Sequence, residues 1–180
     1  MLPSLRVFVI AFVTLATISH SRARAEDAFG DQTCPNVTPA GRHLNALVDA
    51  STILSDDLVS AAQAMVDGYR ACKHGYDDNA YHNHEGETGT SVTDALPIGR
   101  LYARLALARS LQRVGVYAVD GKKYADARIA FADAIKNIDE MATIDVGSLA
   151  FGDTSEHRML GEGQDLKKQV ESSVVNLPAP

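Results

Sequence analysis

The chain of 180 residues lacks most of the motifs that would identify a function directly. It has two cysteines and no Cys-x-x-Cys pair, so neither a dithiol redox site nor a c-type haem site is predicted. A Gly-x-Ser-x-Gly turn and a glycine-rich phosphate loop are also missing. Acidic residues outnumber basic ones, 23 to 17, and the net charge of −6 argues against nonspecific nucleic-acid binding.

Carboxylate pairs suited to acid–base catalysis are missing as well. The paired acids Asp56-Asp57, Asp77-Asp78 and Asp139-Glu140 are sequence neighbours. Neighbouring side chains on a helix point about 100° apart, so such pairs are poor acid–base partners. The sequence therefore predicts a protein that is not an enzyme.

The first 25 residues have the three parts of a secretory signal peptide. Arg6 supplies a positive charge, residues 7–18 are an apolar run, and Ala23-Arg24-Ala25 is a small-x-small cleavage site. As a helix the apolar run rises only about 18 Å, which is too short for a hydrocarbon core of about 30 Å. We expect cleavage after Ala25 and a secreted or periplasmic protein of net charge −9 that does not insert into the membrane.

The composition, 46% hydrophobic and 22% charged, is that of a soluble globular protein. Apolar spacings of three and four residues predict helices over about 39–54, 55–75, 94–121, 124–138 and 164–175. We therefore expect an all-α protein, a small bundle or short solenoid of four to five helices arranged as hairpins. Its parts would be an N-terminal segment (26–37), a helical domain (38–141) and a partly ordered C-terminal segment (142–180) with a short helix.

Two of these expectations concern the first hairpin. Thr38-Pro39 is typical of an N-cap followed by proline, and Ser55 is expected to cap the second helix. A tight connection makes the two helices antiparallel, which brings Cys72 close to Cys34. We predict a disulfide between them, worth about 3–4 kcal/mol in the loop-entropy model. The alternative is two free thiols, one of them a metal ligand or redox group.

Residues 108–140 resemble a single tetratricopeptide repeat, a helix-turn-helix unit of 34 residues. The matching positions are Val114-Gly115 for the family's Leu-Gly, Tyr124 for its turn tyrosine, and Ala127, Phe131 and Ala134 for its small–aromatic–small pattern. One such unit needs neighbours to bury its apolar face. The resemblance implies stacked helical hairpins and, from the usual task of the family, peptide binding.

The segment also departs from the repeat at three positions. The first-helix tyrosine of the family falls on Ala118, its turn glycine on Lys122 and its closing proline on Asp139.

A basic helix is the first candidate binding surface. Between Asp94 and Asp120 there is no acidic residue, and the segment carries four arginines: Arg100, Arg104, Arg109 and Arg113. Such a helix is suited to a protein or peptide partner that presents carboxylates. The alternative is that these arginines pair with acids on neighbouring helices, for which the candidates are Asp49, Asp56, Asp57, Asp126 and Asp133.

A histidine-rich acidic loop, residues 74–87, is the second candidate. Its potential ligands for Zn²⁺, Cu²⁺ or Ni²⁺ are His82, His84, Glu85 and Glu87, with His74 and Asp77 or Asp78 nearby. A solvated loop without metal explains the same residues. We predict an exported, non-enzymatic helical binding or scaffold protein without a cofactor; the alternative is a soluble metal-binding protein that uses this loop.

Overall fold

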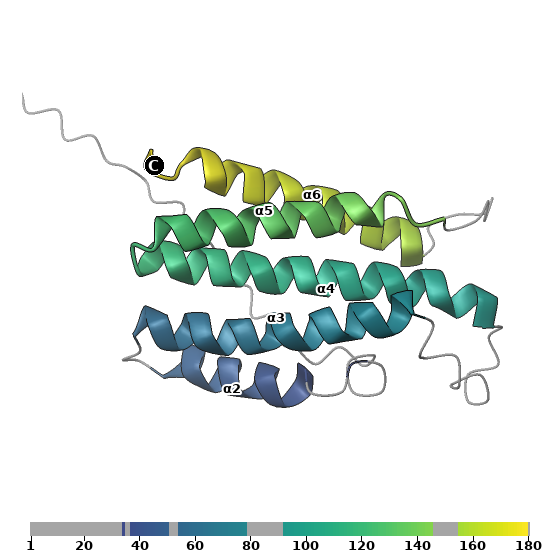
Figure 1. Ribbon diagram of the computed structural model, residues 1–180, viewed down its shortest axis with the longest axis horizontal. Coiled ribbons are helices and arrows are strands. Elements are labelled where there is room, and N and C mark those ends of the chain that lie inside the picture. Colours follow the sequence, from purple (N-terminus) through teal and green to yellow (C-terminus); the bar gives the residue numbers. More distant parts are fainter. Residues whose placement is uncertain (1–33, 35–36, 51–53, 79–91, 146–154, 180) are drawn as a thin grey trace, which may run out of the picture.

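The computed structural model describes residues 34, 37–50, 54–78, 92–145 and 155–179 (Figure 1). They form α2 (Val37–Asp49), α3 (Ser55–Asp77), α4 (Val92–Asp120), α5 (Tyr124–Met141) and α6 (Ser155–Val175). No strand occurs in these ranges, and the five helices pack as adjacent hairpins. The predicted all-α fold is confirmed.

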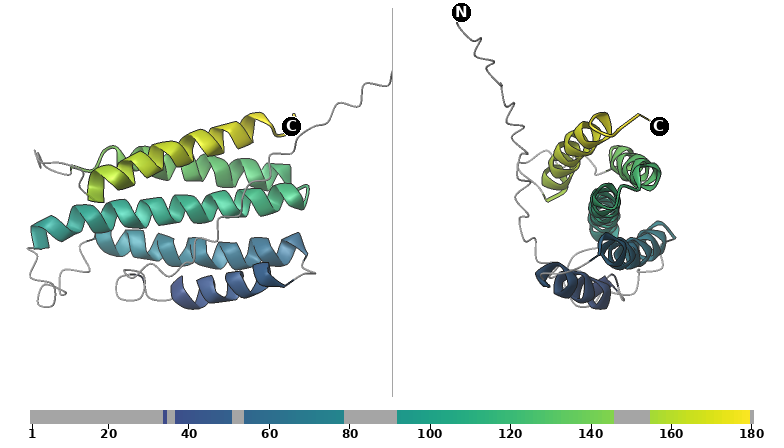
Figure 2. Two further views of the ribbon diagram at one scale, coloured as in Figure 1. Left: turned by 180° about the vertical axis from the view of Figure 1, so that it is seen from behind. Right: turned by 90° about the vertical axis from the view of Figure 1, so that its left-hand side faces the viewer.

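Helix α4 lies at the centre of the molecule. Helices α3 and α5 both pack along it, α2 lies on the far side of α3, and α6 packs on α5 and α4. The end view in Figure 2 shows this order, with α4 between α3 and α5. The central position of α4 leaves α3 and α5 as two walls on either side of it.

Burial along α4 follows from that position. The spacing of apolar residues by three and four predicts one broad face on this helix. It consists of Ile98, Leu101, Leu105, Ala108, Leu111, Val114 and Ala118, and all of these except the half-buried Ile98 are buried. The structure also buries Ala103, Ala106 and Leu107, which lie outside the predicted face. A helix with neighbours on three sides is apolar around most of its circumference, so a single apolar stripe predicts too few of its buried residues.

Two aromatic rings lie directly on glycines of α4. A Cβ atom built on Gly115 would lie 2.3 Å from the ring of Phe131, and one on Gly99 would lie 2.1 Å from the ring of Tyr76. The missing side chains let α5 and α3 approach the α4 backbone closely while the rings fill the space between helices.

The turn between α4 and α5 holds one residue in the left-handed region. Lys122 has φ 58°, at the position where the tetratricopeptide repeat has its glycine. A residue with a side chain is disfavoured in this conformation, which glycine adopts freely. The turn is closed by backbone hydrogen bonds from Gly121 to Tyr117 (3.0 Å) and from Lys123 to Ala118 (2.7 Å).

The predicted disulfide is present. Cys34 and Cys72 are bonded, their Cα atoms are 5.1 Å apart, and both side chains are buried. Cys34 precedes α2 and Cys72 lies in the second half of α3, so the bond closes the open end of the hairpin.

Two helix starts differ from the prediction. Helix α2 begins at Val37, two residues before Pro39. Helix α3 begins at Ser55 itself, so its N-cap residue is Leu54 and not Ser55. Leu54 has extended backbone and makes no side-chain cap. Its carbonyl accepts a hydrogen bond from the Asp57 N–H (3.1 Å), which supplies the first-turn partner that the Ser55 side chain was expected to supply.

The last helix is longer than predicted. Helix α6 begins at Ser155, nine residues before the expected start, and runs through Gly161 and Gly163. Glycines inside a helix lower its intrinsic stability, which is why the sequence indicates a later start. Packing overrides this tendency, because Gly163 lies against Met141 and Val170 is fully buried.

Other predictions concern residues outside the described ranges. The signal peptide over 1–25 is one of them, as is most of the N-terminal segment 26–37. In the ranges that are described, no helix combines the length and apolar character needed to cross a bilayer.

Candidate functional site

A groove runs between α3 and α5, with α4 as its floor. It encloses about 330 Å³. Residues from all three helices line it: Arg70, Lys73, His74 and Asp77 from α3, Leu107 and Leu111 from α4, and Asp133, Lys136, Asn137 and Glu140 from α5. Polar walls above a leucine floor make this surface suitable for a ligand that has both polar and apolar groups.

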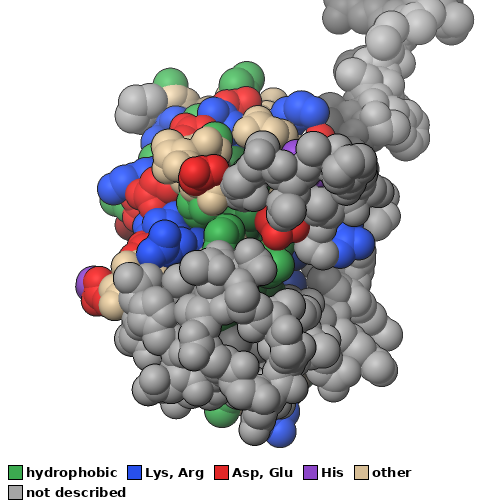
Figure 3. Space-filling model, turned by 90° about the vertical axis from the view of Figure 1, so that its right-hand side faces the viewer, with side chains coloured by type: hydrophobic (Ala, Val, Ile, Leu, Met, Phe, Trp, Pro, Cys, Tyr) green, Lys and Arg blue, Asp and Glu red, His purple; other side chains and the backbone are tan. Residues whose placement is uncertain are grey.

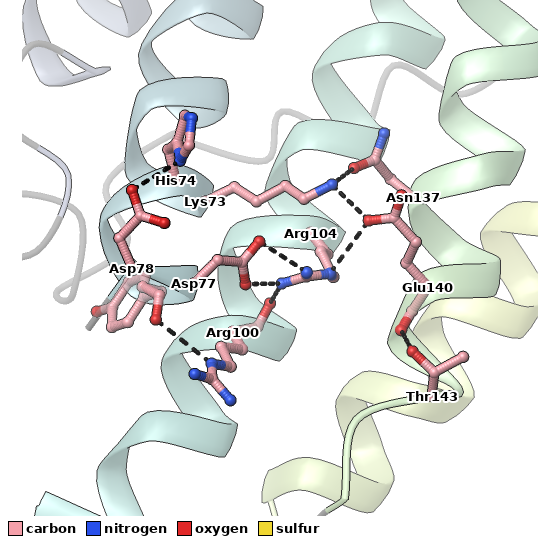
Figure 4. Close-up of polar contacts among 10 residues, drawn as sticks. Lys73, His74, Asp77, Asp78, Arg100, Arg104, Asn137, Glu140 and Thr143 are labelled. Atoms are coloured by element: carbon pink, nitrogen blue, oxygen red, sulfur yellow. Dashed lines mark hydrogen bonds and ion pairs between the residues drawn. The ribbon is translucent and has the colours of Figure 1, made fainter. Parts of the chain in front are cut away.

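A buried arginine lies beneath the groove and contacts two of its lining residues. Arg104 is 9% exposed, and its two terminal nitrogens donate to the two carboxylate oxygens of Asp77 at 2.9 Å each (Figure 4). Its Nε lies 3.4 Å from Oε2 of Glu140. The guanidinium therefore joins α4 to both walls, since Asp77 belongs to α3 and Glu140 to α5.

Lys73 spans the groove next to Arg104. Its Nζ donates to Oδ1 of Asn137 at 3.2 Å and to the carboxylate of Glu140. Asn137 is itself held by a hydrogen bond from its Nδ2 to the carbonyl of Asp133 (2.8 Å). Lys73 and Arg104 thus share the single carboxylate of Glu140, as Figure 4 shows.

This arrangement leaves one buried donor without a hydrogen bond. Among the described residues the Arg104 Nε–H has no hydrogen-bond partner, because its approach to Glu140 does not have hydrogen-bond geometry. A buried donor without a partner loses its hydration and gains nothing in return. The network is consequently not at its most favourable arrangement while Glu140 is held by Lys73.

Replacing Arg104 by glutamine is expected to lower the free energy of unfolding by about 2–3 kcal/mol, since Asp77 and Glu140 would lose their shared cation. The effect is smaller than for fully buried pairs because both carboxylates are about one-third exposed. Urea denaturation measures it. The control is Lys168→Gln, which removes only an exposed pair with Asp165 and should change stability by less than about 0.5 kcal/mol. Equal effects of the two substitutions would show that Arg104 does not join the helices.

The rims of the groove carry charges of both signs. Arg70 pairs with Asp67 on its own helix at 3.2 Å. On the opposite rim, Lys136 and the Asp133 carboxylate form no ion pair or hydrogen bond with any described residue. Figure 3 looks onto the right-hand end of Figure 1 and shows basic and acidic side chains side by side on the described surface.

The structure separates the four arginines of the predicted basic helix. Arg100 Nε donates to the Tyr76 carbonyl at 3.3 Å, and Arg104 belongs to the groove. Arg109 lies on another side of α4, where it pairs with Glu162 of α6 at 2.5 Å. Arg113 is half-buried near Tyr117. The four arginines therefore do not form one continuous surface, and their role in partner binding stays a prediction.

The acids that hold Arg104 and Arg109 are not those named from the sequence. Arg104 is held by Asp77 and Glu140, and Arg109 by Glu162. One of the expected candidates, Asp56, lies at the opposite end of the bundle and pairs with Lys123 at 2.7 Å. The pairing depends on how the helices are rotated about their axes, which sequence spacing does not determine.

The predicted metal ligands His82, His84, Glu85 and Glu87 lie outside the described residues. The potential ligands named near them, His74, Asp77 and Asp78, lie at the end of α3. Asp77 is bound by Arg104, and His74 pairs with Asp78 at 3.1 Å. No group of three potential ligand side chains occurs within the described ranges.

Lys73, Asn137 and Glu140 were not recognised from the sequence as site residues. A signal was nevertheless present: Asn137 and Arg104 occupy positions on the apolar faces of their helices, and both are buried. A polar residue in an apolar stripe indicates a buried polar partner, although not which partner it is.

The shifted pKa values belong to groups outside the groove. Burial raises the pKa of Tyr117, and the positive charge of Arg113 opposes that rise. Hydrogen bonds to Asp56 and Asp139 raise the pKa values of Lys123 and Lys167, respectively. These shifts keep Tyr117 neutral and the two lysines charged at physiological pH, as is usual for these groups.

Comparison with protein-family models, with curated proteins and with solved structures finds no match to this chain. The fold and the groove therefore define only a class: an all-α protein of adjacent helical hairpins with a polar groove over its central helix.

Proposed function

We propose that the chain is an exported, non-enzymatic binding or scaffold protein that holds a segment of a partner polypeptide in the groove between α3 and α5. The observation that carries the proposal is the groove itself. Its volume of about 330 Å³ is at the lower end of the range for ligand sites, and it combines the apolar floor of Leu107 and Leu111 with hydrogen-bonding groups on both walls.

A polypeptide suits this combination of groups. Its backbone supplies donors and acceptors to both walls, and its side chains supply apolar contact to the floor. The walls belong to two helices that Arg104 joins to α4 and Lys73 joins to each other, so the groove is formed before a ligand arrives. Preformed sites lose less conformational entropy on binding than surfaces that must order themselves.

The charged residues of the groove favour binding over catalysis. Asp77 and Glu140 are engaged by Arg104 and Lys73 in the ion pairs that join the helices. A general acid or base needs instead a side chain that can come within hydrogen-bond distance of the proton it transfers.

Site-specific photo-cross-linking tests the proposal. A benzophenone amino acid replaces Lys136 on the groove rim or, as the matched control, Lys168 on the exposed face of α6. The protein is irradiated in the extracytoplasmic fraction of its native source. We expect a discrete cross-linked product from position 136 and none from position 168. Products from both positions, or from neither, would contradict a binding role for the groove.

A further inference from the structure

We infer that the ligand of this groove carries a carboxylate, as an acidic side chain or the C-terminus of a polypeptide, and that this carboxylate binds Lys73 in place of Glu140. The inference rests on the proposed function, because it names the chemistry that the same groove recognises. Its physical basis is the competition of two cations for one carboxylate.

Lys73 is the cation that a ligand can reach. Its side chain is 21% exposed and lines the groove, whereas that of Arg104 is 11% exposed and does not line it. The Lys73 ammonium donates to Asn137 and to Glu140. An ammonium has three N–H donors, so it can keep Asn137 while it exchanges one carboxylate for another.

Arg104 supplies the reason why this exchange is favourable. Its buried Nε–H has no hydrogen bond within the described part of the chain, and Glu140 Oε2 lies 3.4 Å away. When a ligand carboxylate takes over Lys73, Glu140 is free to turn fully toward Arg104 and accept that hydrogen bond. The bond gained at Arg104 offsets the bond that Glu140 loses at Lys73.

The charges around Lys73 are balanced. Arg104 pairs with Asp77, Lys73 with Glu140 and Arg70 with Asp67. The α5 rim carries both the exposed Lys136 and the half-buried Asp133. A ligand carboxylate is therefore attracted by the Lys73 ammonium itself once Glu140 has turned to Arg104, and not by a net positive charge of the groove.

Fluorescence anisotropy with two labelled peptides tests the inference. One is a peptide of alternating glutamate and glycine, and the matched probe has glutamine in place of every glutamate. At low salt we expect the glutamate peptide to bind at least about tenfold more tightly, as for a charge-assisted contact. Lys73→Gln should remove most of this preference without unfolding the protein, because Glu140 can still pair with Arg104.

Two rim variants give effects of opposite sign and do not depend on Lys73. Asp133→Asn should tighten binding of the glutamate peptide about two- to fivefold, and Lys136→Gln should weaken it by a similar factor. Lys168→Gln on α6 is the control and should change nothing. Rim variants that leave the affinity unaltered, or an affinity that Lys73→Gln does not lower, would overturn the inference.

The outcomes also separate the inference from the proposed function. If both peptides bind equally, the groove binds polypeptides but does not select a carboxylate. If neither peptide binds while photo-cross-linking from position 136 succeeds, the acidic ligand is wrong and the binding role survives. If both experiments fail, the proposed function fails as well.

Discussion

Replacing Cys34 and Cys72 together by alanine is expected to lower the free energy of unfolding by about 3–4 kcal/mol. The bond joins residues 38 positions apart, and without it the unfolded chain regains the entropy of an open loop of that length. Urea denaturation of the variant and the oxidised protein measures the difference. A loss below about 1 kcal/mol would show that the bond is not structural.

The loss of stability in the double alanine variant should be concentrated in α2. This helix packs mainly on α3, and the Cys34 carbonyl accepts a hydrogen bond from the N–H of its first residue, Val37, at 3.3 Å. Hydrogen exchange of the double alanine variant should therefore show reduced protection across α2, with α4 and α5 much less affected. A uniform loss of protection would mean that the disulfide stabilises the whole molecule and not the first hairpin.

Phe131→Ala is expected to cost about 3–5 kcal/mol, the range for removing a buried aromatic side chain. Phe131 is 1% exposed, and its ring fills the space above Gly115 where α4 and α5 meet. Ile129 on the same helix is the matched control: it is 64% exposed, so Ile129→Ala should change stability by less than about 0.5 kcal/mol. Thermal denaturation followed by circular dichroism distinguishes the two variants.

A double substitution tests the contact itself. Gly115→Ala alone should be destabilising, because its Cβ would lie 2.3 Å from the Phe131 ring. In the Phe131→Ala background the same change should be neutral or stabilising, since the ring is gone and alanine favours the helix more than glycine does. Additive effects would mean that the two residues do not contact each other.

Much of the fold could be predicted from the sequence because it depends on local patterns. Apolar residues three and four positions apart predict the helices, and the short connection between the first two predicts an antiparallel pair. That pairing was enough to place Cys72 beside Cys34. The early start of α6 could not be predicted in this way, because Gly161 and Gly163 oppose the helix locally and packing stabilises it.

The candidate site was less accessible to sequence reasoning because it depends on three helices at once. Lys73 and Glu140 are far apart in the sequence and meet only when α3 and α5 both pack along α4. The sequence indicates Asp77 only as a nearby metal ligand or as half of an unsuitable acid–base pair, because nothing in its sequence neighbours points to an arginine on another helix. The rotation of α4 about its axis turns Arg104 toward Asp77 and Arg109 toward α6. These two arginines therefore pair with acids of neighbouring helices instead of belonging to one basic surface.

The measurement that tests the groove most directly is methyl NMR of the leucine side chains during titration with the glutamate peptide. Leu107 and Leu111 form the floor, whereas Leu44 of α2 and Leu166 of α6 lie in the core away from it. We expect shifts at Leu107 and Leu111 that saturate with the affinity found by anisotropy, while Leu44 and Leu166 stay unchanged. Shifts confined to Leu44 or Leu166, or none at all, would contradict a ligand site between α3 and α5.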